Sequence, residues 1–172
     1  MDTAKLRGQS FGLLIMLAVQ FALGMALNLF VKLPKAHPGQ TGGYFARTVH
    51  GFGWAITNGG GIVLILHVIV AIGLLLASLA LLARAIASQS RSWTVAGLIG
   101  FLGIVAALTN GLAFIGYNSD ITSYVMAMGF IVAAVSYSAA LSFAAVPAKA
   151  AKPAGQKASP ALRGHHYRPR HT

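Results

Sequence analysis

The chain has 172 residues, of which 56% are hydrophobic and only 9% are charged, and its formal net charge is +11 at pH 7. Soluble domains carry about a quarter charged residues, so this composition excludes an ordinary soluble domain. The absence of cysteine excludes disulfides, thiolate chemistry and Cys-attached c-type haem, and two acidic residues, Asp2 and Asp120, are too few for paired-carboxylate catalysis.

The first apolar run covers residues 11–31 and follows a short basic segment that contains Lys5 and Arg7. This run is longer than the apolar region of a secretory signal peptide, and Lys-Leu-Pro-Lys at 32–35 follows it in place of a small-residue cleavage site. A run of about 18 or more apolar residues is long enough to cross a bilayer. We therefore expect an uncleaved first transmembrane helix.

The loop at residues 32–60 is rich in glycine and proline but contains a segment with helical periodicity. Within residues 44–57, large apolar residues recur at intervals of three or four: Phe45, Val49, Phe52 and Ile56. This spacing predicts a short amphipathic helix that lies on the outer membrane interface. Residues of the loop and of the other face of this helix are candidates for an outer cap: His37, Arg47, His50 and Trp54.

Three further apolar runs, at residues 62–83, 94–116 and 121–145, predict three more transmembrane helices. A tight turn precedes the last of them, and Asp120 is expected to cap its first turn. Beyond residue 146 the composition changes to Pro, Ala, Lys, Gly, Arg and His, which lacks the apolar residues that a core requires. We therefore divide the chain into a four-helix transmembrane domain at 1–146 and a disordered basic tail at 147–172.

The distribution of basic residues predicts how the chain is inserted in the membrane. With a cytoplasmic N-terminus, ten of the 13 basic residues lie on the cytoplasmic side, six of them in the tail, and three lie outside: Lys32, Lys35 and Arg47. By the positive-inside rule we expect a multi-pass plasma-membrane protein with both termini in the cytoplasm. The polybasic tail is expected to bind anionic lipid, and its one aromatic residue, Tyr167, gives no basis for nucleic-acid binding.

Each span carries small or polar residues at intervals of three and four, a spacing that favours close helix packing in lipid. The predicted contact rows are Gln20, Gly24 and Asn28 on the first span; His67, Ala71 and Ser78 on the second; Ala96, Gly100, Gly103, Ala107 and Asn110 on the third; and Met126, Gly129, Ala133, Ser136 and Ala140 on the fourth. With short connections, these rows predict an all-α membrane protein with an antiparallel up-down-up-down four-helix transmembrane bundle.

One residue from each row lies at a similar depth, about 5–9 Å inside the outer end of its span at a rise of 1.5 Å per residue. This candidate ligand-binding layer consists of Asn28, His67, Asn110 and Met126. His67 is the ionisable member, and ionisable side chains within a bilayer are costly and therefore indicate function. The purely structural interpretation is a hydrogen bond from His67 to Asn110 or Asn28 that joins two helices.

Two cofactor hypotheses use His67 as a ligand. In the first, His67 is one axial ligand of a b-type haem, and the second ligand comes from His50, His37 or Met126. In the second, imidazole and thioether groups of the outer half bind copper. The residues that this copper hypothesis uses are Met25, Met126, Met128, His37, His50 and His67. Small-solute transport is a further hypothesis, although no intramembrane carboxylate or broken helix supports it.

Three segments resemble small four-span membrane proteins of actinobacteria: GMALNLFVKLPKAHPG from Gly24, LHVIVAIGLLL from Leu66 and NGLAFI from Asn110. The resemblance covers the four spans and implies their topology, and it brings no known function or cofactor. Haem A synthases and cytochrome b561-type proteins differ, because they carry histidines on several helices.

From the sequence as a whole we expect a small membrane module without independent catalytic activity. It would be an accessory subunit of a membrane complex or homo-oligomer, or a bundle that binds a small ligand around His67. The leading alternative is electron transfer through haem b, and the second alternative is copper or small-solute transport.

Overall fold

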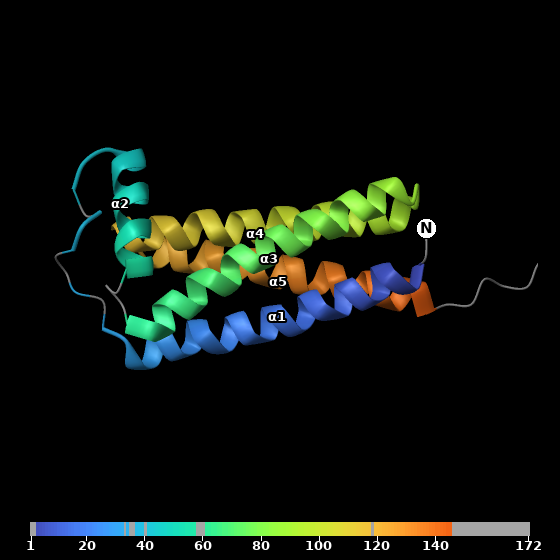
Figure 1. Ribbon diagram of the computed structural model, residues 1–172, viewed down its shortest axis with the longest axis horizontal. Helices are drawn as coiled ribbons and strands as arrows, with labels where there is room; N and C mark the ends of the chain where they lie inside the picture. Colours follow the sequence, from blue (N-terminus) through green and yellow to red (C-terminus); the bar gives the residue numbers. More distant parts are fainter. Residues whose placement is uncertain are drawn as a thin grey trace, which may run out of the picture.

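The computed structural model describes residues 3–32, 34, 37–39, 41–57, 61–117 and 119–145. Lys35 and the predicted tail at 147–172 lie outside these residues. The described part of the chain is all-helical and contains five α-helices (Figure 1). They are α1 (Thr3–Phe30), α2 (Tyr44–Thr57), α3 (Gly61–Ala87), α4 (Arg91–Tyr117) and α5 (Asp120–Ala145).

Four of these helices, α1, α3, α4 and α5, are long and apolar enough to cross a membrane. With 28, 27, 27 and 26 residues, each is about 40 Å long, which exceeds the roughly 30 Å hydrocarbon core of a bilayer. The prediction of four spans is therefore confirmed. The helices extend beyond the predicted spans, most clearly in α1, which begins at Thr3 because Lys5 and Arg7 end the apolar run without breaking the helix.

Each long helix packs against two of the other three. Helix α1 packs against α3 and α5, and α4 packs against the same two helices. Between the described residues, the backbones of α1 and α4 do not come close to each other, nor do those of α3 and α5, so these pairs lie on the diagonals of the bundle. In Figure 1 the chain passes back and forth along the long axis, and α2 runs across one end and packs against α3 and α4. We call this end the α2 end.

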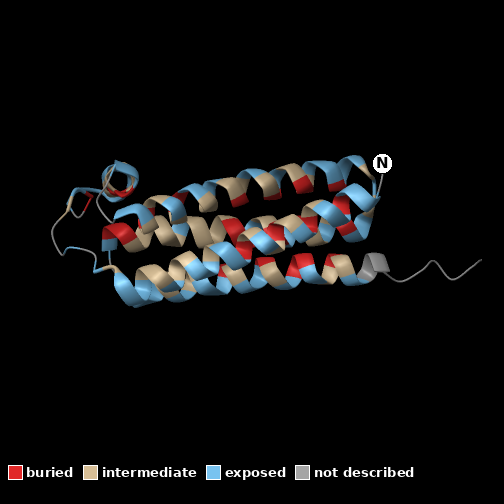
Figure 2. Cartoon of the chain, turned by 60° about the horizontal axis from the view of Figure 1, so that its bottom comes forward, coloured by how far each residue is buried: buried red, intermediate tan, exposed pale blue. Residues whose placement is uncertain are grey.

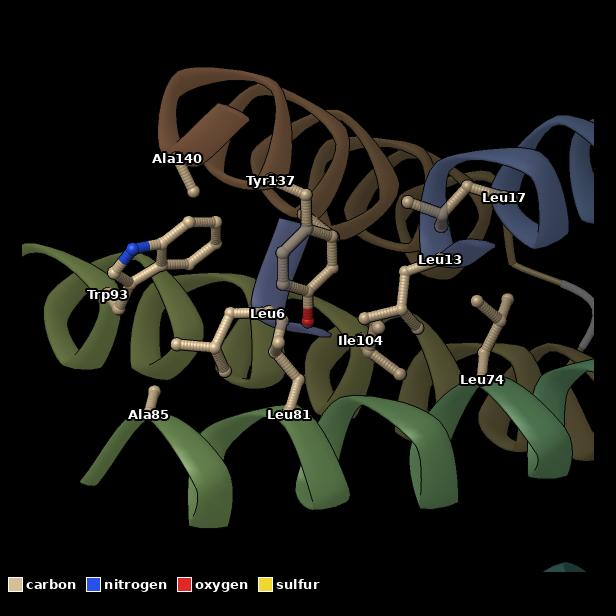
Figure 3. Close-up of a cluster of buried hydrophobic side chains, with 11 residues drawn as sticks. Leu6, Leu13, Leu17, Leu74, Leu81, Ala85, Trp93, Ile104, Tyr137 and Ala140 are labelled. Atoms are coloured by element: carbon tan, nitrogen blue, oxygen red, sulfur yellow. The ribbon is translucent and has the colours of Figure 1, made fainter. Parts of the chain in front are cut away.

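The interior is filled by one main cluster of apolar side chains from all four long helices (Figures 2 and 3). Its buried members are Leu6, Leu13, Leu17, Leu74, Leu81, Ala85, Trp93, Ile104, Ala133, Tyr137 and Ala140. Large apolar side chains also cover the outside of the bundle, among them Phe11, Leu76 and Val135 at about 60% exposure. An apolar surface on every side is expected of helices that face hydrocarbon rather than water.

The closest backbone approach lies between α4 and α5, where the predicted small-residue rows meet. A Cβ atom added to Gly129 would lie 2.5 Å from the carbonyl oxygen of Gly103, and one added to Gly103 would lie 2.7 Å from the carbonyl oxygen of Gly129. Ala107 and Ala133 flank this crossing. Towards the other end of the same interface, the Ser136 hydroxyl donates to the carbonyl of Ala96 at 2.7 Å. Small residues in both rows therefore allow the two backbones to come together.

Helix α1 is joined to α3 by polar side chains at the end opposite α2. The Gln9 side-chain amide donates to the carbonyl of Ala77 at 3.0 Å, and the Arg84 guanidinium donates to Gln9 Oε1 at 2.7 Å. These contacts pair the start of α1 with the second half of α3. They fix the relative height of the two helices along the bundle axis.

Helix α2 docks on the bundle through its smallest residues. Gly51 and Ala55 are buried, and a Cβ atom added to Gly51 would lie 3.1 Å from the Ile115 side chain. The larger apolar residues of the predicted face differ in how far they are buried. Phe52 packs against the cluster around Ala55 and Ile115, whereas Val49 and Phe45 are exposed, Phe45 with 82% of its surface. The helix thus combines a small-residue docking face with an exposed apolar face.

The turn before α5 differs from the sequence prediction. Helix α5 begins at Asp120, and the carbonyl of Ser119 accepts the amides of Thr122 and Ser123 at 3.1 and 3.3 Å. Ser119 therefore occupies the capping position, and Asp120 lies in the first turn. The expectation that Asp120 is the cap was wrong by one residue, although its carboxylate still stabilises the positive end of the helix dipole.

Candidate functional site

His67 lies in the second turn of α3 and faces α1. Its Nε2 atom is 3.1 Å from Nε2 of the Gln20 amide. One turn further along α1, Gly24 lies against the imidazole: an added Cβ atom would be 3.4 Å from Cε1 and 3.9 Å from Nδ1 of His67. A polar pair therefore spans the α1–α3 interface in the half of the bundle near α2.

The hydrogen bond between Gln20 and His67 leaves polar atoms of both residues unused. An amide NH₂ is a donor, so in this geometry His67 Nε2 accepts and the imidazole proton lies on Nδ1. Within the described part of the chain, His67 Nδ1 and Gln20 Oε1 are buried and have no hydrogen-bond partner. If the amide were turned over, the proton would move to Nε2, and the pair would again retain one free donor and one free acceptor.

The surroundings of this pair favour a neutral imidazole. The sequence has two acidic residues, and the one within a helix, Asp120, is exposed at the start of α5. An imidazolium at His67 would therefore be a charge within the span without a carboxylate counter-ion from its own helix or from α1. What remains is an uncharged donor–acceptor pair enclosed by apolar helices.

Of the four predicted layer residues, only His67 makes a side-chain hydrogen bond to another helix in the described residues. The Asn110 amide donates to the carbonyl of Ala106, in its own helix, at 2.9 Å. The Met126 sulfur faces α4 and would lie 3.3 Å from a Cβ atom added to Gly111. Asn28 is exposed. Each of the four side chains therefore has its own surroundings, and no hydrogen bond between described residues joins any two of them.

The predicted hydrogen bond from His67 to Asn110 or Asn28 was wrong, because the partner is Gln20. The register that sets Gln20 opposite His67 sets Asn28, two turns further along α1, opposite the first residues of α3. Little of α3 remains there to cover the Asn28 side chain, which is consequently exposed. Gln20 belonged to the same predicted row but lay too deep for the layer.

Three of the four cap candidates belong to two clusters at α2, and the fourth, His50, lies apart from both. His37 stacks on Trp54 with 4.3 Å between ring centroids, and its Nδ1 atom lies 2.8 Å from the carbonyl of Pro38. Arg47 Nε donates to the carbonyl of Gly42 at 2.9 Å, and its guanidinium lies 4.7 Å from the ring centroid of Tyr117. His50 belongs to neither cluster and is exposed.

The contacts of the described histidines bear on the haem hypothesis, and the copper hypothesis, which also uses methionines, stays a prediction. Among the described residues, no three His, Cys, Asp or Glu side chains lie close enough together to hold a metal ion. For a haem, His67 Nε2 already interacts with Gln20, His37 is stacked on Trp54, and His50 is exposed. An iron ligand at His67 would therefore need the Gln20 contact to open and a second ligand to be supplied from elsewhere.

Two polar features of the interior were missed by sequence reasoning. Ser10 and Tyr137 are fully buried, and the hydroxyls of both lack a hydrogen-bond partner among the described residues. The signal for Ser10 was its position between Leu6 and Leu13, one turn from each on the same helix face. Tyr137 had no such signal, because the small residue that accommodates its ring, Gly100, lies on another helix.

Comparison with known protein families, curated proteins and solved structures finds no match to this chain.

Proposed function

We propose that this protein is a membrane module that binds a small neutral ligand at the α1–α3 interface, beside His67 and Gln20. The observation that supports this function is the pair of buried atoms without hydrogen-bond partners among the described residues, His67 Nδ1 and Gln20 Oε1. A buried polar atom without a partner costs about 1–3 kcal/mol, so a ligand that satisfies both atoms binds with that much in its favour.

The chemistry of the site limits the class of ligand. One free donor and one free acceptor match a group that has both functions, such as an amide, a hydroxyl or a protonated carboxyl. The residues next to Gln20 and His67 in their helices are apolar, and a charged ligand would have no acidic residue of α1 or α3 as a counter-ion. The ligand that fits is an amphiphile with a small uncharged polar group and an apolar body.

The arrangement in the membrane follows from the helix contacts and the charges. We propose an antiparallel up-down-up-down bundle in the plasma membrane, with both termini cytoplasmic. In the described residues, Lys5, Arg7, Arg84 and Arg91 belong to the end opposite α2, and Lys32 and Arg47 to the α2 end. In this orientation α2 lies on the outer interface with its exposed apolar residues at headgroup depth.

The same orientation assigns each proposed binding partner to one side of the membrane. The ligand site lies in the outer half of the bundle, the basic tail binds anionic lipid on the cytoplasmic side, and the bundle associates with a membrane complex or with a second copy of itself. Catalysis is not part of this proposal, because the pair at His67 and Gln20 contains no carboxylate, hydroxyl or thiol beside the imidazole.

Native mass spectrometry of protein extracted in mild detergent tests the ligand site. We expect a non-covalent small-molecule adduct on the wild-type protein and its loss from the Gln20→Leu and His67→Leu variants. Asn28→Leu is the matched control, because Asn28 occupies the same row of α1 but is exposed, and it should retain the adduct. A wild-type protein without any adduct, or an adduct that survives both substitutions, would contradict the proposal.

An absorption spectrum of the same preparation separates the ligand site from the haem alternative. We expect no Soret band. A Soret band that disappears in His67→Leu would replace the ligand proposal with a b-haem protein whose axial ligand is His67.

A further inference from the structure

A layer of hydroxyl groups lies in the interior of the bundle, in the half opposite α2 and away from His67. Ser10 of α1, Ser78 of α3 and Tyr137 of α5 are each buried, with 0% of the side chain exposed. They lie in a mainly apolar interior, where a hydroxyl group is costly unless its hydrogen bonds are satisfied.

Independent contacts place the three residues at one height along the bundle. The hydrogen bond from Gln9 to the carbonyl of Ala77 joins the immediate neighbours of Ser10 and Ser78. The Tyr137 hydroxyl lies beside Ser78. In Figure 3 this hydroxyl points inward among Leu6, Leu81 and Ile104.

Glycine and serine side chains leave room for the tyrosine in this layer. A Cβ atom added to Gly100 of α4 would lie 2.5 Å from the Tyr137 ring and 2.8 Å from its hydroxyl oxygen. Ser10 and Ser78 occupy positions between leucines on their helices, where a third leucine would fill the space with hydrocarbon. The layer therefore takes one residue from each helix: the large Tyr137 from α5, a serine each from α1 and α3, and a glycine from α4.

The hydrogen bonds of the layer are incomplete. The Ser78 hydroxyl donates to the carbonyl of Leu75 at 2.8 Å, so its oxygen can still accept. The hydroxyls of Ser10 and Tyr137 make no hydrogen bond of acceptable geometry with any described residue, Ser78 included. The three buried residues thus retain two donors without partners among the described residues and three oxygens that can accept.

We propose that Ser10, Ser78 and Tyr137 bind one buried water molecule. Water accepts the protons of Tyr137 and Ser10 and donates one of its own to the oxygen of Ser78, which makes three hydrogen bonds and satisfies both free donors. Buried waters typically make about three hydrogen bonds to groups that would otherwise be unsatisfied. The single water would join α1, α3 and α5. At this height along the bundle, the side-chain hydrogen bonds between described residues do not link all three helices.

Thermal unfolding in detergent tests this site through a double-mutant cycle. Tyr137→Phe and Ser10→Ala should each lower the unfolding midpoint, by about 2–4 °C for a hydrogen bond of ordinary strength in a chain of this length. The double variant should lose clearly less than the sum, because both hydroxyls bind the same water. Tyr124→Phe is the control, since Tyr124 is 65% exposed on the same helix, and it should leave the midpoint unchanged.

Either of two other results would overturn the proposal. A higher midpoint for Tyr137→Phe would show that the hydroxyl is unsatisfied in the native protein. Strictly additive effects would show that Ser10 and Tyr137 use separate partners, for example a carbonyl of the preceding helical turn for Ser10. A crystal structure supplies the second measurement: density within hydrogen-bond distance of all three hydroxyls is expected in the wild type and should be lost in Tyr137→Phe.

Discussion

Replacing Gly129 by alanine is expected to lower the free energy of unfolding by about 3 kcal/mol, at the upper end of what overpacking costs. The added methyl group would lie 2.5 Å from the carbonyl oxygen of Gly103 and 2.8 Å from the amide nitrogen of Ala107. Both are backbone atoms of α4, and they cannot move without moving the helix. The expected response is a separation of α4 and α5 along their whole contact, measured as a lower unfolding midpoint in detergent.

Two other substitutions serve as the comparison for this prediction, one with the same expected effect and one as a control. Gly103→Ala should act in the same direction, because its methyl group would lie 2.7 Å from the carbonyl oxygen of Gly129. Gly12→Ala is the matched control: it also lies within a long helix, but an added Cβ atom meets nothing within 4 Å. Alanine favours helix over glycine by about 1 kcal/mol, so Gly12→Ala should be neutral or stabilising. Equal midpoints for all three variants would contradict the proposed backbone crossing.

Replacing Gly39 by alanine is expected to detach α2 while the long helices stay folded. Gly39 has a φ of +101°, where a Cβ atom is strained, and the added methyl group would lie 2.5 Å from the backbone nitrogen of Gly51. The strain and the overpacking together amount to about 3 kcal/mol. Since α2 packs only against α3 and α4 among the other described helices, this energy acts locally. Hydrogen exchange should become faster in residues 44–57 and remain slow in α4.

Gly42→Ala separates the two causes. Gly42 has nearly the same φ, +99°, but an added Cβ atom meets only the side chain of Ala46, at 3.3 Å. It should therefore show the conformational cost without the backbone contact, and accelerate exchange in α2 much less than Gly39→Ala. If both variants behaved alike, the docking of residues 37–39 on α2 would not contribute to holding this helix in place.

The two polar features of the bundle differ in their position, in their free hydrogen-bonding groups and in the role that we propose for them. The pair at His67 and Gln20 lies near the α2 end and keeps one donor and one acceptor free. The layer at Ser10, Ser78 and Tyr137 is closed on all sides by apolar residues. In our proposals the first binds a small ligand, and the second binds a water that is part of the folded structure.

Some of these features could be predicted from the sequence, because they depend on residues that are near one another in the chain. Apolar runs predicted four spans, and intervals of three and four placed Gly103 and Gly129 on contact faces. His67 was singled out because it is an ionisable residue within an apolar span. Each of these inferences needs only the helical repeat and the size or polarity of successive side chains.

The partners of those residues were decided by the tertiary structure alone. The alignment of α1 with α3 gave His67 the amide of Gln20 and left Asn28 exposed, although both lie on the same row of α1. The approach of α4 to α5 made room at Gly100 for the ring of Tyr137. Relative height, rotation and crossing of helices result from the packing of all their side chains together, and no local pattern in the sequence specifies them.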